Sequence, residues 1–163
     1  MTEERKRQDS QEMQVRRMKE GDGEAVAALE ARLFSDAWSL SAVKSGLAAP
    51  AQTFFVVQTD AGKIIGYAAI MTVMDEGELL RIGTDPDFQR QGAASLLMDQ
   101  VMKTAEEKGL SFMLLEVRQS NVPAVSLYEK YGFSREGVRR NYYQDPAEDA
   151  LIMRREFPVR NCR

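Results

Sequence analysis

Hydrophobic and polar residues follow patterns along the first part of the chain that are typical of a strand and then of helices. Met13 and Val15 are separated by polar neighbours, which predicts a short strand. From Asp22, the predicted N-cap, apolar residues recur at helical spacing, and a second short helix is expected over residues 39–47. The apolar positions of the first helix are Ala25, Val26, Leu29, Leu33 and Phe34.

The middle of the chain has the pattern of consecutive strands. Two β-rich runs, residues 53–59 and 63–74, are joined by a short turn that contains Gly62, and this arrangement predicts a hairpin. A polar turn is expected over residues 75–78. A third strand is expected over residues 79–84, where a proline at the second following position ends it.

The second half of the chain alternates between helix and strand. The expected elements are a helix over residues 90–108, a strand over 111–117, a helix over 123–131, and strands over 133–142 and 149–157. The predicted core positions of the long helix are Ala94, Leu97, Val101 and Ala105. The apolar run 111–117 is typical of a strand buried in a parallel pairing. The whole order predicts an α/β (α+β) protein with a mixed central sheet flanked by helices.

Length and composition indicate one globular domain. The chain has 163 residues without an internal repeat or linker, so we expect a single domain over residues 12–163, preceded by a flexible polar tail over residues 1–11. A formal net charge of −3 argues against a protein that mainly coats nucleic acid. No apolar run approaches the roughly 20 residues of a membrane span, and we therefore expect a cytoplasmic protein.

Two scarce residue types limit the chemistry. The chain has no histidine, which excludes Ser-His-Asp and Cys-His catalysis and imidazole metal ligands. Its one cysteine, Cys162, excludes an intramolecular disulfide framework and a zinc site built on several thiolates, and we expect no metal. Acid–base chemistry must then come from Glu, Asp, Tyr, Lys, Cys162 or an ordered water.

The segment Gln89-Arg90-Gln91-Gly92-Ala93-Ala94 lies between a predicted strand and the long helix. Its small side chains let a ligand approach the backbone closely. The free N–H groups of a first helical turn can hold a pyrophosphate, and Arg90 adds a positive charge. Tight packing of the helix is the alternative explanation for these small residues. The segment is neither a P-loop nor a dinucleotide-binding loop, because GxxxxGK(S/T) and GxGxxG are both absent.

This loop resembles the pyrophosphate loop of the GCN5-related N-acetyltransferases (GNAT), written Q/R-x-x-G-x-G/A, where that family binds acetyl-CoA. The similarity extends from about residue 15 to residue 153 and is greatest to the RimI-type enzymes, which acetylate the N-termini of ribosomal proteins. The segments that carry it are Phe34-Ser35-Asp36-Ala37-Trp38-Ser39, Arg81-Ile82-Gly83-Thr84-Asp85-Pro86, Leu115-Glu116-Val117-Arg118-Gln119-Ser120-Asn121, Leu127-Tyr128-Glu129-Lys130-Tyr131-Gly132-Phe133, and Arg139-Arg140-Asn141-Tyr142-Tyr143 with Glu148-Asp149-Ala150.

The chain also departs from the subfamily pattern. The strand before the loop reads Arg81-Ile82-Gly83-Thr84 where Asn-Ile-Ala-Val is usual. Ala37 replaces a common proline, and Ala94 stands where glycine is frequent. Arg81 is the departure with the largest consequence, because it brings a positive charge next to the predicted site.

The resemblance implies the GNAT fold, in which the acetyl donor acetyl-CoA lies where two parallel strands splay apart. In that family the strand occupied here by residues 82–84 pairs with the pantetheine arm and offers a backbone amide to the thioester carbonyl. A monomer or a weak dimer is expected. The expected acetyl-CoA-binding residues are Ile82, Gly83, Thr84, Gln89, Arg90, Gln91, Gly92, Ala93, Ala94, Ser95, Asn121 and Tyr128.

Glu116 is the candidate general base. It interrupts an apolar strand, where burial disfavours a charged carboxylate, and the resemblance implies that it accepts the proton of the amine directly or through water. The alternative is a structural ion pair with Arg118, or with Arg81 on the neighbouring strand. Such a partner would instead favour the charged carboxylate.

Tyr128 is the candidate general acid. It lies seven residues after Asn121, about two helical turns along the same face, and the resemblance implies that its hydroxyl protonates the departing CoA sulfur. The alternative is a tyrosine whose ring packs in the core. Asn121 is expected to bind the donor, although its position also suits a helix N-cap.

The amine substrate is narrowed by the cost of deprotonation. An α-amine has a pKa of about 7.7–8.0 and a lysine side chain one of about 10.4, so a neutral lysine costs about 3 kcal/mol more. A carboxylate base therefore suits an N-terminal amine better. The acidic stretches 75–78 and 145–149 favour a basic peptide if they flank the cleft. The resemblance implies a peptide-side wall formed by Trp38, Tyr142 and Tyr143, and a hairpin with a solvated acidic tip is the alternative.

The sequence thus predicts an acetyl-CoA-dependent acyltransferase that modifies the N-terminal amine of a protein. Its expected partner is a basic ribosomal protein, with neither nucleic acid nor membrane involved. The usual target of the subfamily, the N-terminal alanine of protein eighteen of the small ribosomal subunit, fits this description. The alternatives are an enzyme that acetylates a small amine, such as a polyamine or an aminoglycoside, and a non-catalytic CoA-binding module.

Overall fold

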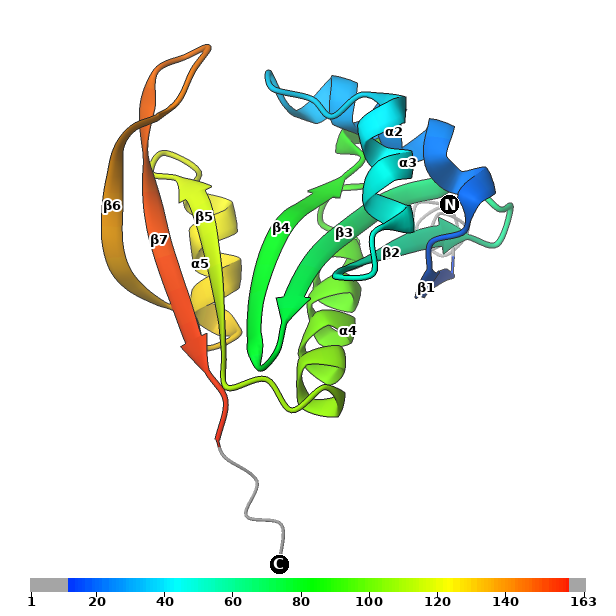
Figure 1. Cartoon of the computed structure of the whole chain (residues 1–163). Helices are drawn as coiled ribbons and strands as arrows, with labels where there is room; N and C mark the ends of the chain where they lie inside the picture. The colour runs from blue at the N-terminus through cyan, green and yellow to red at the C-terminus, as the bar shows by residue number, and fades with distance from the viewer. Residues whose placement is uncertain (1–11, 159–163) are drawn as a thin grey trace, which may run out of the picture.

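A seven-stranded sheet with helices on both faces forms the centre of the protein, in a computed structural model that describes residues 12–158 (Figure 1). The strands are β1 (Met13–Arg17), β2 (Gln52–Thr59), β3 (Ile64–Val73), β4 (Glu76–Thr84), β5 (Phe112–Arg118), β6 (Ser134–Tyr143) and β7 (Glu148–Glu156). The helices are α2 (Gly23–Leu33), α3 (Leu40–Ala48), α4 (Ala93–Glu107) and α5 (Val122–Lys130), with short 3-10 turns η1 (Glu20–Asp22) and η2 (Pro86–Phe88). The predicted fold class and the predicted order of helices and strands are confirmed. The predicted tail, residues 1–11, and Cys162 lie outside the described residues.

The strands follow the order β1-β2-β3-β4-β5-β7-β6. Neighbours are antiparallel except for β4 and β5, which run parallel. That parallel pairing is short, because it joins only residues 76–79 of β4 to residues 112–115 of β5. Beyond it the two strands diverge, and the sheet opens into a V between β4 and β5 (Figure 1).

A β-bulge in β4 lies where this opening begins. Leu79 and Arg81 pair with adjacent residues of β3, so that Leu80 between them is an extra residue. The bulge changes the alternation of side chains along the strand. Leu80 packs on the core beneath α2 and α3, Arg81 points to the same side, and Ile82 packs on the opposite core. An arginine is therefore turned toward α2 at the mouth of the V.

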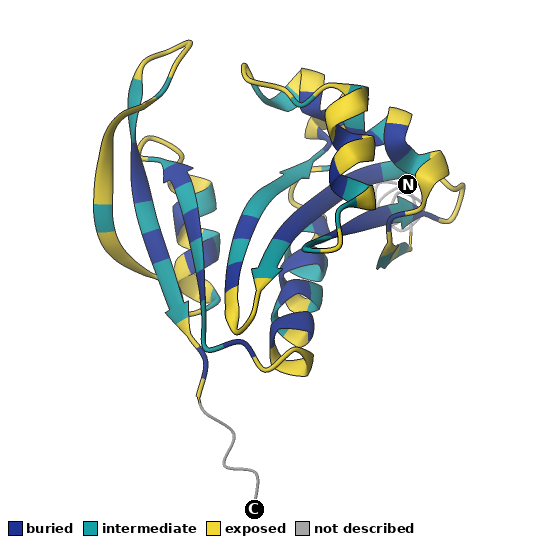
Figure 2. Ribbon diagram, viewed as in Figure 1, coloured by how far each residue is buried: buried dark blue, intermediate teal, exposed yellow. Residues whose placement is uncertain are grey.

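Two hydrophobic cores lie on the two faces of the sheet. The larger fills the space between the sheet and helices α4 and α5, and the smaller lies beneath α2 and α3. Figure 2 shows buried positions on the sheet and on the inner sides of the helices, with exposed positions on their outer sides. No helix among residues 12–158 is long and apolar enough to cross a membrane.

The start of β4 differs from the prediction of a polar turn over residues 75–78. The strand already begins at Glu76. The reason is Gly77, which is buried against the segment leading into β5: a Cβ at this position would lie 2.7 Å from Leu110 Cδ1. A glycine lets β4 approach this close, and the predicted turn is reduced to its first part.

The start of α4 also differs from the prediction. The helix begins at Ala93, which is buried, whereas Ala94, predicted in the core, is only partly buried. Leu97 and Val101 define the core side of the helix, and the residue one turn before Leu97 is Ala93. Ala94 is thereby left for the opposite, open side.

Asp22 precedes α2 as predicted, but its side chain does not cap the helix. The carboxylate instead binds the Arg16 guanidinium through two contacts of 2.7 and 2.9 Å, and it accepts the Lys19 backbone N–H. This ion pair ties the start of α2 to β1.

Candidate functional site

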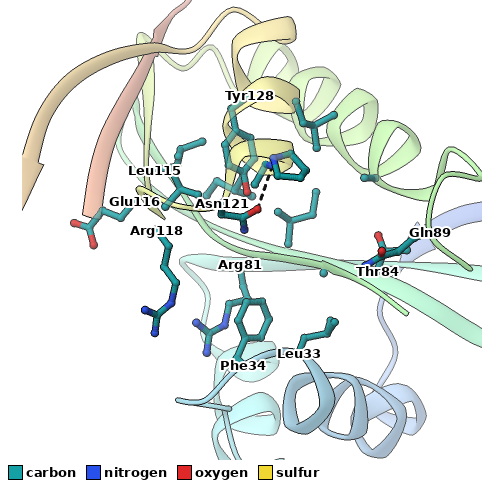
Figure 3. Close-up of a pocket in the computed structure, with 18 of the residues that line it drawn as sticks. Leu33, Phe34, Arg81, Thr84, Gln89, Leu115, Glu116, Arg118, Asn121 and Tyr128 are labelled. Atoms are coloured by element: carbon teal, nitrogen blue, oxygen red, sulfur yellow. Dashed lines mark hydrogen bonds between the residues drawn. The ribbon is translucent and has the colours of Figure 1, made fainter. Parts of the chain in front are cut away.

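A cavity of about 840 Å³ lies where β4 and β5 separate (Figure 3). Its walls come from the α2–α3 loop, β4, the first turn of α4, β5, α5 and the β6–β7 loop. Because the β4–β5 ladder stops at residues 79 and 115, the facing edges of both strands border the cavity without pairing to each other. An elongated ligand can therefore form strand-like hydrogen bonds with β4.

The first turn of α4 supplies backbone donors at one end of the cavity. Gly92 is the N-cap, with a φ of 91° that favours glycine, and no side chain caps the helix. Within the described residues, no protein group accepts a hydrogen bond from the amides of Ala93, Ala94 or Ser95. These free donors and the positive end of the helix dipole suit a phosphate or a pyrophosphate.

Nearly all of the predicted acetyl-CoA-binding residues line this cavity. Gln91 is the exception, because it is exposed and lies outside the lining. Gly83 also has a packing reason, since a Cβ there would lie 2.7 Å from Leu33 Cδ1. The lining residues from the predicted set are Ile82, Gly83, Thr84, Gln89, Arg90, Gly92, Ala93, Ala94, Ser95, Asn121 and Tyr128. Their role in binding stays a prediction.

Asn121 caps helix α5. Its side-chain oxygen accepts the backbone N–H of Ala124 at 3.3 Å, drawn as the dashed line in Figure 3. Within the described chain its Nδ2 has no protein partner, although the residue lines the cavity. Asn121 can therefore cap the helix and still donate a hydrogen bond to a ligand.

Tyr128 projects from α5 toward Asn121 and the cavity (Figure 3). The residue is 6% exposed, and its ring packs edge-to-face on Phe133 with the centroids 6.1 Å apart. Burial raises the pKa of Tyr128, and the nearby Tyr143 raises it further, so the hydroxyl stays protonated at neutral pH. Within residues 12–158 no hydrogen bond to another protein group holds this hydroxyl. It is available as a proton donor to a group in the cavity.

Glu116 lies on the other face of β5. Leu115 and Val117 are buried in the core against α4 and α5, and the alternation of a strand places Glu116 on the opposite side. In Figure 3 its carboxylate points away from Tyr128. The candidate acid Tyr128 and the candidate base Glu116 thus lie on opposite faces of the sheet, and the gap between β4 and β5 connects the two faces.

One partner of Glu116 is an arginine that the sequence pattern did not identify. Arg139 of β6 approaches the carboxylate with 2.8 Å between Nε and Oε1. The Tyr142 side chain is a second partner, and its interaction with the carboxylate raises the pKa of Tyr142. The two partners considered from the sequence are wrong: Arg118 pairs with Glu148 at 3.4 Å, and Arg81 turns toward α2. Because Arg139 is largely exposed, this pair contributes little stability and leaves the carboxylate accessible from the surface.

The aromatic residues predicted on the peptide side lie in different environments. Tyr143 lines the cavity and stacks on Arg118 at 4.5 Å, and burial raises the pKa of Tyr143 to about 12. Tyr142 packs against Tyr143 but is exposed and lies outside the lining. Trp38 lies beside a separate shallow hollow, while Phe34 forms the wall of the main cavity.

The predicted acidic stretches flank the cavity only in part. Asp145 lines it, whereas Glu148 is held by hydrogen bonds from Ser120. Asp36, from the α2–α3 loop, is an acidic lining residue that lies outside both predicted acidic stretches. In the described part of the chain, no group of three or more His, Cys, Asp or Glu side chains is arranged to hold a metal ion.

Glu78 is a member of this site that the sequence pattern concealed, because it seemed to lie in a turn. In β4 it pairs in register with Leu114, which makes it a diagonal neighbour of Glu116 on the same face. Burial raises the pKa of Glu78, and the negative charge of Glu116 raises it further, while Arg139 lowers it. Two carboxylates and one arginine therefore share this face of the opening.

The raised pKa of Glu78 leads to a prediction for stability. The folded protein binds the Glu78 proton more tightly than the unfolded chain does, so stability falls as the pH rises from the ordinary pKa of about 4.3 through the raised value. At neutral pH Glu78→Gln should therefore raise the melting temperature. The gain should shrink as the pH approaches the ordinary pKa.

Thermal unfolding followed by circular dichroism across this pH range tests the prediction. Glu76→Gln is the matched control, because Glu76 is exposed on the same strand. A Glu78→Gln protein that is no more stable than the wild type at neutral pH would contradict it.

Comparisons with known proteins agree with this architecture. The model of the Acetyltransferase (GNAT) family matches residues 23–133. A [ribosomal protein bS18]-alanine N-acetyltransferase of Escherichia coli K12 is 43% identical over 97 residues, which are 58% of this chain and 66% of that protein, just under two thirds. The N-alpha-acetyltransferase RimI of Mycobacterium tuberculosis is 34% identical over 154 residues, which are 91% of this chain and 95% of the relative. The crystal structure of the ribosomal-protein-S18-alanine N-acetyltransferase from Escherichia coli matches with a TM-score of 0.83 at 32% identity, over 93% of this chain and 99% of that one.

The family match includes the segments that build most of the cavity. Residues 23–133 contain the α2–α3 loop, both splayed strands and the helices that follow them. The long similarity to the Mycobacterium tuberculosis relative extends beyond this range toward both ends of the domain. The chain therefore belongs to the GNAT family of acetyltransferases.

Proposed function

We propose that the protein transfers the acetyl group of acetyl-CoA to the α-amine of a protein N-terminus, and that its target is the N-terminal alanine of ribosomal protein bS18. The observation that carries this proposal is a single cavity lined by three features. These are the free backbone amides at the start of α4, the unpaired edge of β4, and the Glu116 carboxylate on the opposite face of the sheet from Tyr128. The names of the relatives support the choice of target. We place the reaction in the cytoplasm, where ribosomal proteins are made, and it needs neither a metal nor nucleic acid.

Acetyl-CoA fits the donor side of the cavity by its chemistry. Its pyrophosphate carries negative charge, which the free amides of α4 and Arg90 can receive. The pantetheine arm carries amide groups, which can pair with the open edge of β4 at residues 82–84. Asn121, which follows the end of β5, adds a side-chain hydrogen-bond donor to the cavity wall. A cavity of about 840 Å³ is in the range of sites that enclose ligands of this size.

The acyl transfer forms one bond and breaks another. The amine nitrogen attacks the thioester carbon, the C–N bond forms and the C–S bond breaks. In this proposal Glu116, directly or through water, takes the proton that the amine loses, and Tyr128 gives its proton to the departing sulfur. A backbone amide of β4 stabilises the negative charge that develops on the carbonyl oxygen. The amine enters on the Glu116 face and the thioester lies toward Tyr128, so the two meet in the gap between the strands.

The charges at the amine side favour a protein N-terminus with a basic sequence behind it. Asp36 and Asp145 lie on the cavity wall, and Glu78 lies beside Glu116. These groups attract a positively charged peptide. An α-amine also sheds its proton at about 3 kcal/mol less cost than a lysine side chain, which suits a carboxylate base.

A peptide competition experiment tests the proposed function. The protein is mixed with acetyl-CoA and a peptide that begins with the N-terminal sequence of bS18 and contains a lysine, and the acetyl group is located by mass spectrometry. We expect the α-amine to be preferred over the lysine ε-amine by at least about a hundredfold. The same peptide with a blocked N-terminus is the control, and its lysine should be acetylated at least about a hundredfold more slowly than the free α-amine. Labelling of lysine alone, or faster acetylation of spermidine than of the peptide, would contradict the proposal.

A further inference from the structure

Arg81 and Glu30 form a buried ion pair on the amine side of the cavity. Glu30 is completely buried in α2, and the Arg81 side chain is 12% exposed. Two parallel contacts of 3.0 Å join the guanidinium nitrogens Nε and Nη2 to the carboxylate oxygens. The carboxylate also accepts a hydrogen bond from the hydroxyl of Tyr67 and one of 3.1 Å from the backbone N–H of Trp38. These contacts are all hydrogen bonds, so they fix the orientation of the Glu30 carboxylate and of the Arg81 guanidinium.

The same arginine holds the loop between α2 and α3. Its Nη2 donates to the backbone carbonyl of Asp36 at 3.0 Å and lies 3.4 Å from the Asp36 carboxylate. Its guanidinium carbon lies 4.1 Å from the ring centre of Phe34 and 4.7 Å from that of Trp38. In Figure 3 Arg81 and Phe34 lie side by side at the cavity. One side chain of β4 therefore fixes the start, the middle and the end of residues 34–38.

This loop borders the entrance for the amine. Phe34, Ser35 and Asp36 line the cavity opposite β5. The Ser35 hydroxyl also lies 3.5 Å from the carbonyl of Gln144, so the loop meets the β6–β7 loop across the opening. A small displacement of residues 34–38 would therefore change the width of the opening between these two loops.

Stability alone does not account for such a pair. The cost of removing two charges from water offsets most of their attraction, and well-packed neutral residues often stabilise a fold equally well. The directional contacts, in contrast, select one geometry of the loop.

We propose that Arg81 is a positioning residue, which uses the buried Glu30 as its anchor to hold residues 34–38 in the shape that receives the amine substrate. The proposal rests on the proposed function for the identity of that substrate. It assigns Arg81 an effect on the affinity for the peptide and none on the affinity for acetyl-CoA.

Two variants remove the fixed geometry in different ways. Arg81→Lys keeps the positive charge beside Glu30 but lacks the planar fork and the stacking surface. The double variant Glu30→Gln/Arg81→Gln removes both charges and keeps an oxygen for Tyr67. The matched control is Arg16→Gln/Asp22→Asn, which breaks another two-contact arginine–carboxylate pair outside the cavity lining.

Steady-state kinetics and hydrogen–deuterium exchange measured by mass spectrometry provide the test. In both Arg81 variants we expect the KM for the N-terminal peptide to rise by about tenfold, while the KM for acetyl-CoA changes by less than about twofold. Amide exchange should become faster in residues 34–38 and stay unchanged in residues 82–84. The control should match the wild type in all of these measurements. If Arg81→Lys lacks a cooperative thermal transition, the double variant decides.

Three results would overturn the proposal. One is an unchanged peptide KM and unchanged exchange in residues 34–38 in the folded variants. Another is an equal rise of both KM values, which would mean a general loosening of β4. The third is the same change in the control. If the wild type acetylates no N-terminal peptide, the proposed function fails, and the exchange of residues 34–38 alone then decides whether Arg81 holds the loop.

Discussion

Glu116→Gln is expected to lower kcat/KM for the N-terminal peptide by at least about a hundredfold, within the roughly 10²–10⁴-fold range of general acid–base catalysis. Glutamine keeps the shape of the side chain and one hydrogen-bond-accepting oxygen, but it cannot take the proton of the attacking amine. The affinity for acetyl-CoA should change by less than about twofold, because Glu116 lies on the face of β5 opposite the buried Leu115 and Val117, away from Tyr128.

Steady-state kinetics with the peptide and calorimetric titration with acetyl-CoA measure the two parts of this expectation. Glu129→Gln is the matched control, because Glu129 is an exposed glutamate that pairs with Arg135 at 3.5 Å and lies outside the cavity lining. Its kinetics should equal those of the wild type. Full turnover by Glu116→Gln would exclude a carboxylate base at this position.

The fold could be predicted from the sequence where local patterns decide it. The apolar run of β5, the helical spacing in α4 and the glycine turn between β2 and β3 each depend on neighbouring residues, and all three elements are present. The loop before α4 was found for the same reason, since its small residues and its place before a helix are local features. Only Gln91 of this loop lies outside the cavity lining.

The ion pairs of the site could not be predicted, because they depend on which strands become neighbours. Glu116 meets Arg139 since β7 enters the sheet between β5 and β6, an order that no local pattern contains. The direction of Arg81 depends on the extra residue Leu80 in β4. Glu30 is concealed for a related reason: it is a charged residue in a helix, yet it is completely buried because Arg81 and other donors surround it.

Tyr128→Phe is expected to lower kcat by about a hundredfold, because it removes the proton donor for the departing sulfur. The substitution deletes only the hydroxyl and keeps the aromatic ring. Burial raises the pKa of Tyr128, so in the wild type the hydroxyl remains protonated through neutral and moderately alkaline pH. Because the hydroxyl has no protein partner in the described residues, its removal leaves no buried group unpaired, and the edge-to-face packing of the ring on Phe133 is retained. The melting temperature and the affinity for acetyl-CoA should therefore stay close to those of the wild type.

Single-turnover kinetics with saturating acetyl-CoA separate the chemical step from product release in this variant. Tyr131→Phe is the matched control, because it also removes a hydroxyl near the end of α5, one that lies 2.8 Å from the Asp99 carboxylate and 3.1 Å from the backbone carbonyl of Ser95. Tyr131 itself lies outside the cavity lining. If Tyr128 acts as the acid, only Tyr128→Phe slows the chemical step. An equal loss in both variants would assign the effect to the packing of α5, and an unchanged chemical step in Tyr128→Phe would mean that water protonates the sulfur.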